Sequence, residues 1–214
     1  MSIADRRERE KQELRDKILK AAGKMFRKEG YEKTSVRKIA KAIDYSVGTI
    51  YLYFKNKDDI FFALHEEGFN LLFEKMSPAL AITHPVERLR ELGRHYMAFA
   101  FEFPETYELM FIQSAPMNII EERLGLHPAE SVSPDKWTAV MKSFGTLHQT
   151  VQECIEQGYF KNPDVNLITF AIWSSVHGMA SLSICKRLEK LFPSHLTDAL
   201  IAETTNMLLD LYQK

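Results

Sequence analysis

The sequence contains little cysteine, proline or glycine, and it has no long uninterrupted run of apolar residues. Among 214 residues there are two cysteines, eight prolines and nine glycines. Two cysteines are too few for a disulfide-rich secreted scaffold, and neither Cys154 nor Cys185 has metal-ligand spacing around it. These observations favour a reduced, cytoplasmic protein. No apolar run approaches the ~18 residues of a membrane span, and the amino terminus lacks the apolar segment of a signal peptide. We therefore expect a cytoplasmic protein with no membrane partner.

Patterns that carry catalysis are also missing. His95, His148 and His177 have no histidine or cysteine three or four residues away, and no Cys-x-x-Cys, glycine-rich phosphate loop or nucleophile elbow occurs. The sequence therefore predicts no catalytic residue, no metal site and no cofactor, and we expect that the protein is not an enzyme.

The residues that are present suit two helical domains. Hydrophobic residues make up 45% of the chain and aromatic residues 11%, which is ample for two cores. Apolar residues recur at three- and four-residue spacing along most of the chain. We predict an all-α fold with a small helical domain at 1–57 and a larger helical domain at 58–214.

Charge is divided unevenly between these two parts. The whole chain has a net charge of −1, but residues 1–57 carry 16 Lys and Arg against 8 Asp and Glu, whereas the remainder carries 12 against 21. A basic head joined to an acidic body concentrates phosphate-binding charge in one place. This distribution favours nucleic acid as the partner of the first domain, although basic helix faces are often simply solvated.

Residues 34–57 predict a helix-turn-helix. Thr34 or Ser35 can cap a first helix that runs to about residue 43, and Ser46 can cap a second helix over 47–54. Between them, Asp44 tolerates the left-handed backbone of a tight turn. The second helix buries Ile50 and leaves polar and aromatic side chains on its other faces, which is typical of a recognition helix in the major groove of DNA.

The stretch from Gly48 to Asp59, Gly-Thr-Ile-Tyr-Leu-Tyr-Phe-Lys-Asn-Lys-Asp-Asp, resembles the signature of the TetR family of bacterial transcription regulators, of the AcrR-like kind. The match extends over residues 14–65. The sequence departs from the family pattern at Asp44, where glycine is usual, and at Tyr45, where a small aliphatic residue is usual. The resemblance implies a homodimer that binds a near-palindromic double-stranded DNA operator and a small-molecule effector.

DNA contacts are assigned partly from this resemblance and partly from chemistry. Tyr51 and Lys57 are implied phosphate contacts, and we expect Tyr53 to join them. Arg37 is expected to bind either a guanine or a phosphate. The complete predicted set is Thr34, Ser35, Arg37, Ser46, Val47, Gly48, Thr49, Tyr51, Tyr53, Lys55 and Lys57.

Further helices are predicted along the rest of the chain. The expected ranges are 9–29 before the motif, 56–76 after it, and then 85–103, a helix opening at Pro104, 134–157, 164–188 and 196–212, with a looser segment at 115–133. The helices at 164–188 and 196–212 are apolar over more than one face. Two such helices from each of two chains would form a four-helix interface; the alternative is a monomer with a large core.

The segment from Trp173 to Ala180 resembles the Trp…His-Gly pattern of one TetR subfamily, whose body is called the WHG domain. A pocket for a small, hydrophobic effector is implied there, and Met and aromatic side chains suit it. The candidate lining residues are Tyr96, Phe99, Met110, Met117, Trp137, Phe144, His148, Trp173 and His177. Core packing is the alternative for each of them, and His177 in particular suits a hydrogen-bonded core position.

The sequence thus predicts a homodimeric transcriptional repressor that an apolar effector releases from its operator. The alternative is a DNA-binding protein controlled by a protein partner, or without any small-molecule effector.

Overall fold

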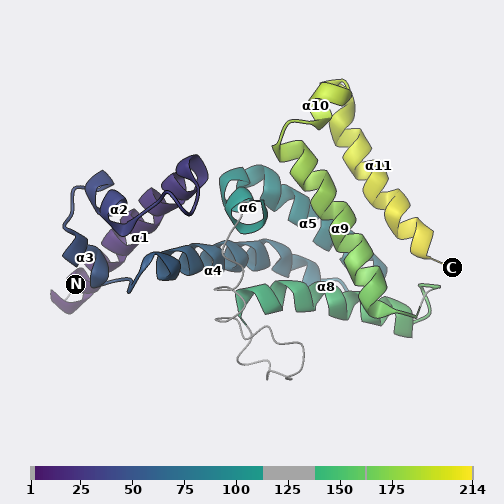
Figure 1. Cartoon of the computed structure of the whole chain (residues 1–214). Coiled ribbons are helices and arrows are strands. Elements are labelled where there is room, and N and C mark those ends of the chain that lie inside the picture. Colours follow the sequence, from purple (N-terminus) through teal and green to yellow (C-terminus); the bar gives the residue numbers. More distant parts are fainter. Residues whose placement is uncertain (1–2, 113–137, 162, 214) are drawn as a thin grey trace. The chain divides into compact units, whose positions relative to one another are not determined.

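The computed structural model describes residues 3–112, 138–161 and 163–213, and these residues are almost entirely helical (Figure 1). Within them, extended backbone pairs at one isolated antiparallel bridge, between Phe160 and Gln213. The predicted all-α fold is confirmed. The described residues form two compact units: the first contains 3–68 and 108–112, and the second contains 69–107 and the residues described after 137.

The first unit is built from α1 (Ile3–Glu29), α2 (Val36–Ala42), α3 (Val47–Tyr51) and the beginning of α4 (Lys57–Met76). Its core contains the apolar positions that the periodicity predicts, namely Ile18, Ala22, Phe26, Ile39, Ala40, Ile43, Ile50 and Phe54. The ring of Phe61 lies edge-on to those of Phe26, at 5.4 Å, and Tyr31, at 5.3 Å. Such pairs add roughly 0.5–1.5 kcal/mol each beyond the burial of their area.

Helix α1 begins earlier than the predicted start at Arg9. Its first turns are exposed, so the apolar periodicity that marks a buried helix is absent there. Instead, side chains four residues apart interact: Arg6 Nε donates to Glu10 at 2.8 Å, and Gln12 Nε2 donates to Asp16 at 2.7 Å. Pairs of this kind stabilise an exposed helix by roughly 0.2–0.5 kcal/mol each.

The turn between α2 and α3 has the capping chemistry that the sequence predicts. Ser35 Oγ accepts from the backbone N–H of Lys38 at 3.3 Å, and Ser46 Oγ accepts from that of Thr49 at 3.0 Å. Asp44 has a φ of 60°, in the left-handed region where glycine is favoured. The departure from glycine at this position therefore leaves the turn in left-handed geometry.

Two side chains cap the beginning of helix α4, one with a carboxamide and one with a carboxylate. Asn56 Oδ1 accepts from the N–H of Asp59, and Asp59 Oδ2 accepts from the N–H of Lys55, both at 2.8 Å. The helix then continues without interruption to Met76, and the two compact units divide within it, after Gly68. The division between domains after Lys57 stays a prediction; the compact unit that contains the head also includes the beginning of α4.

The second unit contains the 3₁₀ helix η1 (Ser77–Ala81), α5 (Pro85–Glu102), α8 (Ala139–Glu156), α9 (Val165–Ile184), α10 (Leu188–Leu191) and α11 (Ser194–Tyr212), and α6 (Pro104–Phe111) begins in it. Helix α5 packs against α8, α9 and α11. Arg88 Nη1 donates to Glu153 at 2.6 Å and so joins α5 to α8. The core between these helices contains Leu89, Leu92, Phe99, Val151, Cys154, Ile168, Ile172 and Val176.

The predicted helix at 164–188 is shorter than expected. Asp164 caps α9 by accepting from the N–H of Leu167 at 3.0 Å, but α9 ends at Ile184. Lys186 has a φ of 53°, and its backbone N–H donates to Ser183 O at 2.9 Å. The backbone N–H of Arg187 donates to Leu182 O, also at 2.9 Å. This pair of bonds is a Schellman motif. Because a lysine stands where such motifs usually have glycine, the sequence does not indicate that α9 ends here. The separate helix α10 was therefore not predicted.

Candidate nucleic-acid interface

Helix α3 is fixed on one side and open on the other. Ile50 is fully buried, whereas Tyr51 is 53% exposed and Gly48 is also at the surface; Val47 and Thr49 are half-exposed. The buried side anchors a helix of five residues, which is too short to be stable alone. The open side presents the residues that the sequence predicts to approach bases.

Two of these residues are linked to each other. Besides the cap to the Thr49 N–H, the hydroxyls of Ser46 and Thr49 lie 2.8 Å apart. One hydroxyl donates to the other, so the second keeps its proton for an outside acceptor. The pair therefore offers a single oriented donor at the beginning of α3.

Lys57 is held by the loop that follows α1. Its Nζ donates to Tyr31 O at 2.9 Å and lies 3.8 Å from the centre of the Tyr31 ring. The Tyr31 hydroxyl in turn donates to the carboxylate of Asp58. An ammonium has three N–H donors, so this arrangement fixes the position of Lys57 and leaves donors for a phosphate.

The remaining predicted contact residues lie in different environments. Ser35, Arg37 and Lys55 are exposed, and Tyr53 is half-buried. Thr34 is the exception, because its side chain is only 2% exposed and its hydroxyl donates to Gly30 O at 2.9 Å. The Thr34 side chain therefore closes the turn after α1 and does not lie on the surface where a DNA contact was predicted.

Lys38, which the sequence leaves as a solvated charge, is engaged within the head. Its Nζ donates to Glu29 at 2.7 Å and to Lys33 O at 2.8 Å. The hydrogen bond from Lys38 lowers the pKa of Glu29. This ammonium joins α2 to the end of α1, so Arg37 is the better placed of the two neighbouring cations to reach DNA.

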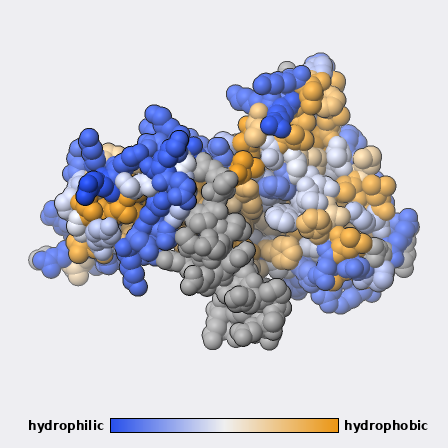
Figure 2. Space-filling model, viewed as in Figure 1, coloured by the Kyte–Doolittle hydropathy of each residue, from blue (hydrophilic) through white to orange (hydrophobic). Residues whose placement is uncertain are grey.

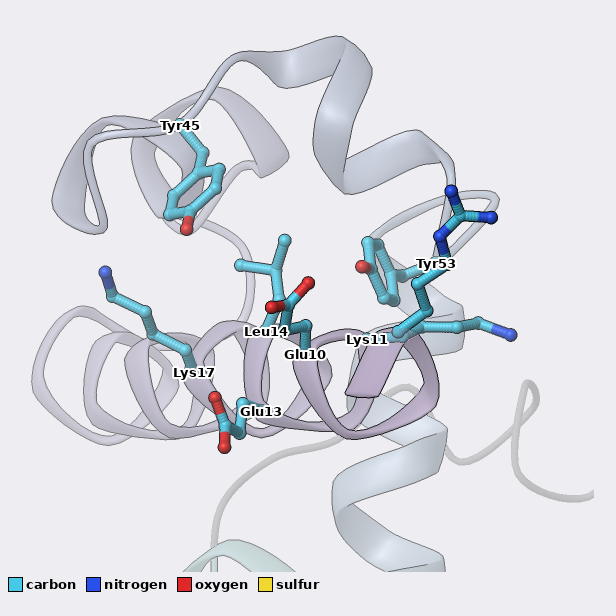
Figure 3. A pocket seen from close by; sticks show the side chains of 8 residues that line it. Glu10, Lys11, Glu13, Leu14, Lys17, Tyr45 and Tyr53 are labelled. Carbon is cyan, nitrogen blue, oxygen red and sulfur yellow. The ribbon is translucent and has the colours of Figure 1, made fainter. Parts of the chain in front are cut away.

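A groove in the head lies between α1 and the helix-turn-helix (Figure 3). It encloses about 550 Å³ and is lined from α1 by basic and acidic side chains, and from the other side by Tyr45 and Tyr53. The sequence signals Tyr45 as a departure from the family pattern. It gives no signal for the α1 side, because exposed charged residues on a helix have no distinguishing spacing.

In the second unit, three polar side chains from three helices converge. The Tyr107 hydroxyl lies 2.6 Å from His177 Nδ1, and the Tyr96 hydroxyl lies 3.1 Å from the same nitrogen and 3.2 Å from the Tyr107 hydroxyl. Burial raises the pKa of both tyrosines, that of Tyr96 to about 12, and lowers the pKa of His177. All three groups are therefore neutral near pH 7, and Tyr107 is a member that the sequence-based set missed.

The other predicted pocket residues are only partly brought together. The ring centre of Trp173 lies 5.8 Å from that of His177 and 6.4 Å from that of Phe144, whereas His148 bonds to the side chain of Asn166 at 3.1 Å. Phe99 is fully buried in this unit, and Met110, which belongs to the first unit, is also buried. Met117 and Trp137 lie outside the described residues. An effector pocket among these side chains stays a prediction.

Helices α9 and α11 each leave an apolar face uncovered. The exposed residues are Leu167, Phe170 and Leu182 on α9 and Leu196, Leu200, Met207 and Leu211 on α11. Hydrophobic surface gathers over α11 in Figure 2. Within the described ranges, α9 is also the one helix whose length and composition would suffice to cross a membrane, a property that core helices of soluble proteins share. In this chain the opposite side of α9 is buried, at Ile168, Ile172, Val176 and Ala180.

A capped helix-turn-helix with an open second helix, followed by a separate helical unit, defines a helix-turn-helix regulator. Comparison with protein families agrees. Residues 18–64 match the model described as "Bacterial regulatory proteins, tetR family", and residues 89–208 match "Tetracyclin repressor-like, C-terminal domain". The chain belongs to the TetR family of transcriptional regulators.

The curated relatives with the higher identities match only part of this chain. The HTH-type transcriptional regulator HbdR of Aromatoleum sp. is 38% identical over 79 residues, and the fatty acid metabolism regulator protein of Bacillus subtilis is 44% identical over 59. These matches span 36% and 28% of this chain and only 34% and 30% of the relatives. AcrR of Shigella flexneri matches further, at 27% identity over 72% of this chain and 70% of its own.

Solved structures share the whole fold at low identity. The fatty acid degradation regulator FadR of Bacillus halodurans has a TM-score of 0.69 and 24% identity, covering 91% of this chain and 94% of its own. PfmR of Thermus thermophilus has a TM-score of 0.64 and 22% identity, covering 90% and 97%. At these identities the similarity establishes the fold, and the controlled genes and effector need separate arguments.

Proposed function

We propose that the protein is a homodimeric repressor that binds a near-palindromic DNA operator and is released by a small, apolar effector. The observation that carries DNA binding is the geometry of α3: Ile50 is buried, while Gly48 and Tyr51 are exposed. The ammonium of Lys57, anchored on Tyr31 O, adds a positioned cation to the same domain. The basic balance of residues 1–57 supports the same partner. A protein that acts on DNA in a bacterium works in the cytoplasm.

The uncovered faces of α9 and α11 support dimerisation. Monomeric proteins rarely leave large contiguous apolar patches on their surface. In the middle of the exposed α9 face, Ser174 and Gly178 are small, and a Cβ added to Gly178 would meet nothing within 4 Å in this chain. Glycine within a helix costs about 1 kcal/mol relative to alanine. Close packing of a second copy of α9 against Gly178 accounts for a glycine at this position, whereas packing within the chain does not.

The neutral cluster of Tyr96, Tyr107 and His177 supports effector binding in the second unit. Its hydroxyls and imidazole suit a polar group on an otherwise apolar molecule. Since two relatives are named for fatty acid metabolism or degradation, acyl compounds are the first class to test. Helix α4 runs from Lys57 in the first unit to Met76 in the second, and we propose it as the element through which an effector acts on the head. Control by a protein partner is the second candidate.

Selection of the purified protein against random DNA duplexes at near-physiological salt tests the proposal. Enrichment of a palindrome is expected. Adding acyl compounds to the selected duplex is then expected to weaken binding, and a Tyr107→Phe variant is expected to bind the duplex normally but to respond less. Failure to enrich any sequence would contradict operator reading, and binding that no small molecule alters would favour the partner-controlled alternative.

A further inference from the structure

The groove between α1 and the helix-turn-helix includes one predicted DNA contact, Tyr53, but its α1 side has no part in the function described so far. Its α1 side is formed by Arg7, Lys11, Leu14 and Lys17, together with two glutamates discussed below, and Tyr45 and Tyr53 face them (Figure 3). The two tyrosines flank the recognition helix: Tyr45 directly precedes its cap, Ser46, and Tyr53 follows its last turn. The groove therefore borders the element that is expected to lie in the major groove of DNA.

Both phenols point into this groove in Figure 3. Tyr45 is 42% exposed, and the Nζ of Lys17 lies 5.1 Å from the centre of its ring. A cation–π contact at an exposed site contributes only about 0.5–1 kcal/mol, so this pair does little for stability. It places an ammonium over the ring of an exposed tyrosine, and Lys17 is itself exposed. The ammonium and the phenol hydroxyl are both donors that suit phosphate oxygens.

The charges around the groove favour an anion despite its two glutamates. The lining carries three cations, Arg7, Lys11 and Lys17, against two carboxylates, and Glu10 also accepts from Arg6 at 2.8 Å. Lys11 lies 4.0 Å from Glu8, and both side chains are more than half exposed. Exposed pairs of this kind are weak, so Lys11 stays available to a stronger anionic partner.

We propose that this groove seats the DNA backbone beside the half-site, with a phosphate held between Lys17 and Tyr45 and the next phosphates along Lys11 and Arg7. The proposal rests on the proposed function, and it extends the DNA contact from the helix-turn-helix to α1. The contact is independent of base sequence, because it uses no base edge. It gives Tyr45, which departs from the family pattern, a role on DNA.

Three matched variants test the proposal by fluorescence anisotropy on a selected operator with long flanks. Lys17→Gln removes the ammonium, Tyr45→Phe removes only the hydroxyl and keeps the ring, and Lys20→Gln removes an exposed α1 lysine outside the groove. Lys17→Gln is expected to bind roughly three- to tenfold more weakly at low salt and to lower the salt slope by about one. Tyr45→Phe is expected to weaken binding without changing the slope, because a hydroxyl displaces no counterion, and Lys20→Gln is expected to match the wild type.

Changing the DNA duplex provides a second test of the same proposal. On an operator trimmed to its half-sites, or with uncharged methylphosphonates at the flanking positions, Lys17→Gln is expected to bind like the wild type. Equal effects of Lys17→Gln and Lys20→Gln, or a lower melting temperature with unchanged DNA binding, would overturn the groove assignment while leaving the proposed function intact. Absence of specific binding by the wild type would instead defeat the proposed function itself.

Discussion

At the residue scale, the head separates side chains that hold the motif together from side chains that are open to DNA. Thr34 is buried and donates to Gly30 O, and the exposed Lys38 donates to Glu29, whereas Arg37 is exposed on the same short helix. Residue type and spacing do not reveal this difference, because all three are polar residues within one short stretch. Their roles follow from tertiary hydrogen bonds that only the folded head supplies.

Replacing Lys57 and replacing Arg37 are expected to change DNA binding in different ways. Lys57→Gln removes an anchored phosphate contact, so binding to all sequences weakens similarly and the salt slope falls by about one. Arg37→Ala is expected to relax preference at one position in each half-site, at a cost of about 1–3 kcal/mol for the preferred base. Competition binding against operators with single base changes measures both. Identical, uniform losses in the two variants would contradict the division between positioning and reading.

Stability is expected to fall in mild acid because of His65. This side chain is buried, 6% exposed, and burial lowers its pKa from 6.5 to about 4. The unfolded chain therefore binds more protons between these values, so the contribution is complete above pH 6.5 and is lost as the pH falls toward 4. The loss amounts to about 3 kcal/mol. Denaturant unfolding of the wild type and His65→Gln across this range measures it.

The variant is expected to have a flatter pH profile. The pKa of His177 is lowered by burial as well, so part of the acid response remains when His65 is replaced. Parallel pH profiles of the two proteins would show that His65 makes no contribution.

At the element scale, helices with a buried apolar stripe are predicted well and exposed ends are not. Val36, Ile39, Ala40 and Ile50 are buried as their spacing predicts. The start of α1 depends on charge pairs across exposed turns, and the end of α9 depends on a left-handed Lys186 that no glycine announces. In both cases local interactions set the helix boundary, and the residue types that normally mark a boundary are absent.

Gly178 gives α9 a testable role in assembly. Gly178→Leu places a branched side chain on the exposed face and is expected to leave a folded protein that is monomeric and binds the operator weakly. Gly178→Ala is the matched control: its Cβ has room in the chain, and its helix propensity is about 1 kcal/mol better. Sedimentation and circular dichroism measure mass and folding. A dimeric Gly178→Leu variant with normal operator binding would exclude this face as the interface.

At the scale of the whole molecule, the sequence allowed the fold class, the family and the position of the motif to be predicted. It did not reveal the convergence of Tyr96, Tyr107 and His177 or the groove beside Tyr45, since both join side chains from segments that are apart in the sequence. One sequence contains no signal for such pairings beyond the chemistry of the residues. The division of the chain inside α4 likewise depends on packing, because no break in helical pattern marks Gly68.

The measurement that tests the central claim most directly is the effect of half-site spacing on operator affinity. Two recognition helices carried by one dimer read half-sites about one helical turn, or a multiple of it, apart. Inserting about half a turn of DNA between the half-sites is expected to reduce binding to the non-specific level, and inserting a whole turn is expected to restore only part of it. Affinity that is unchanged by the half-turn insertion would contradict a dimer that reads both half-sites at once.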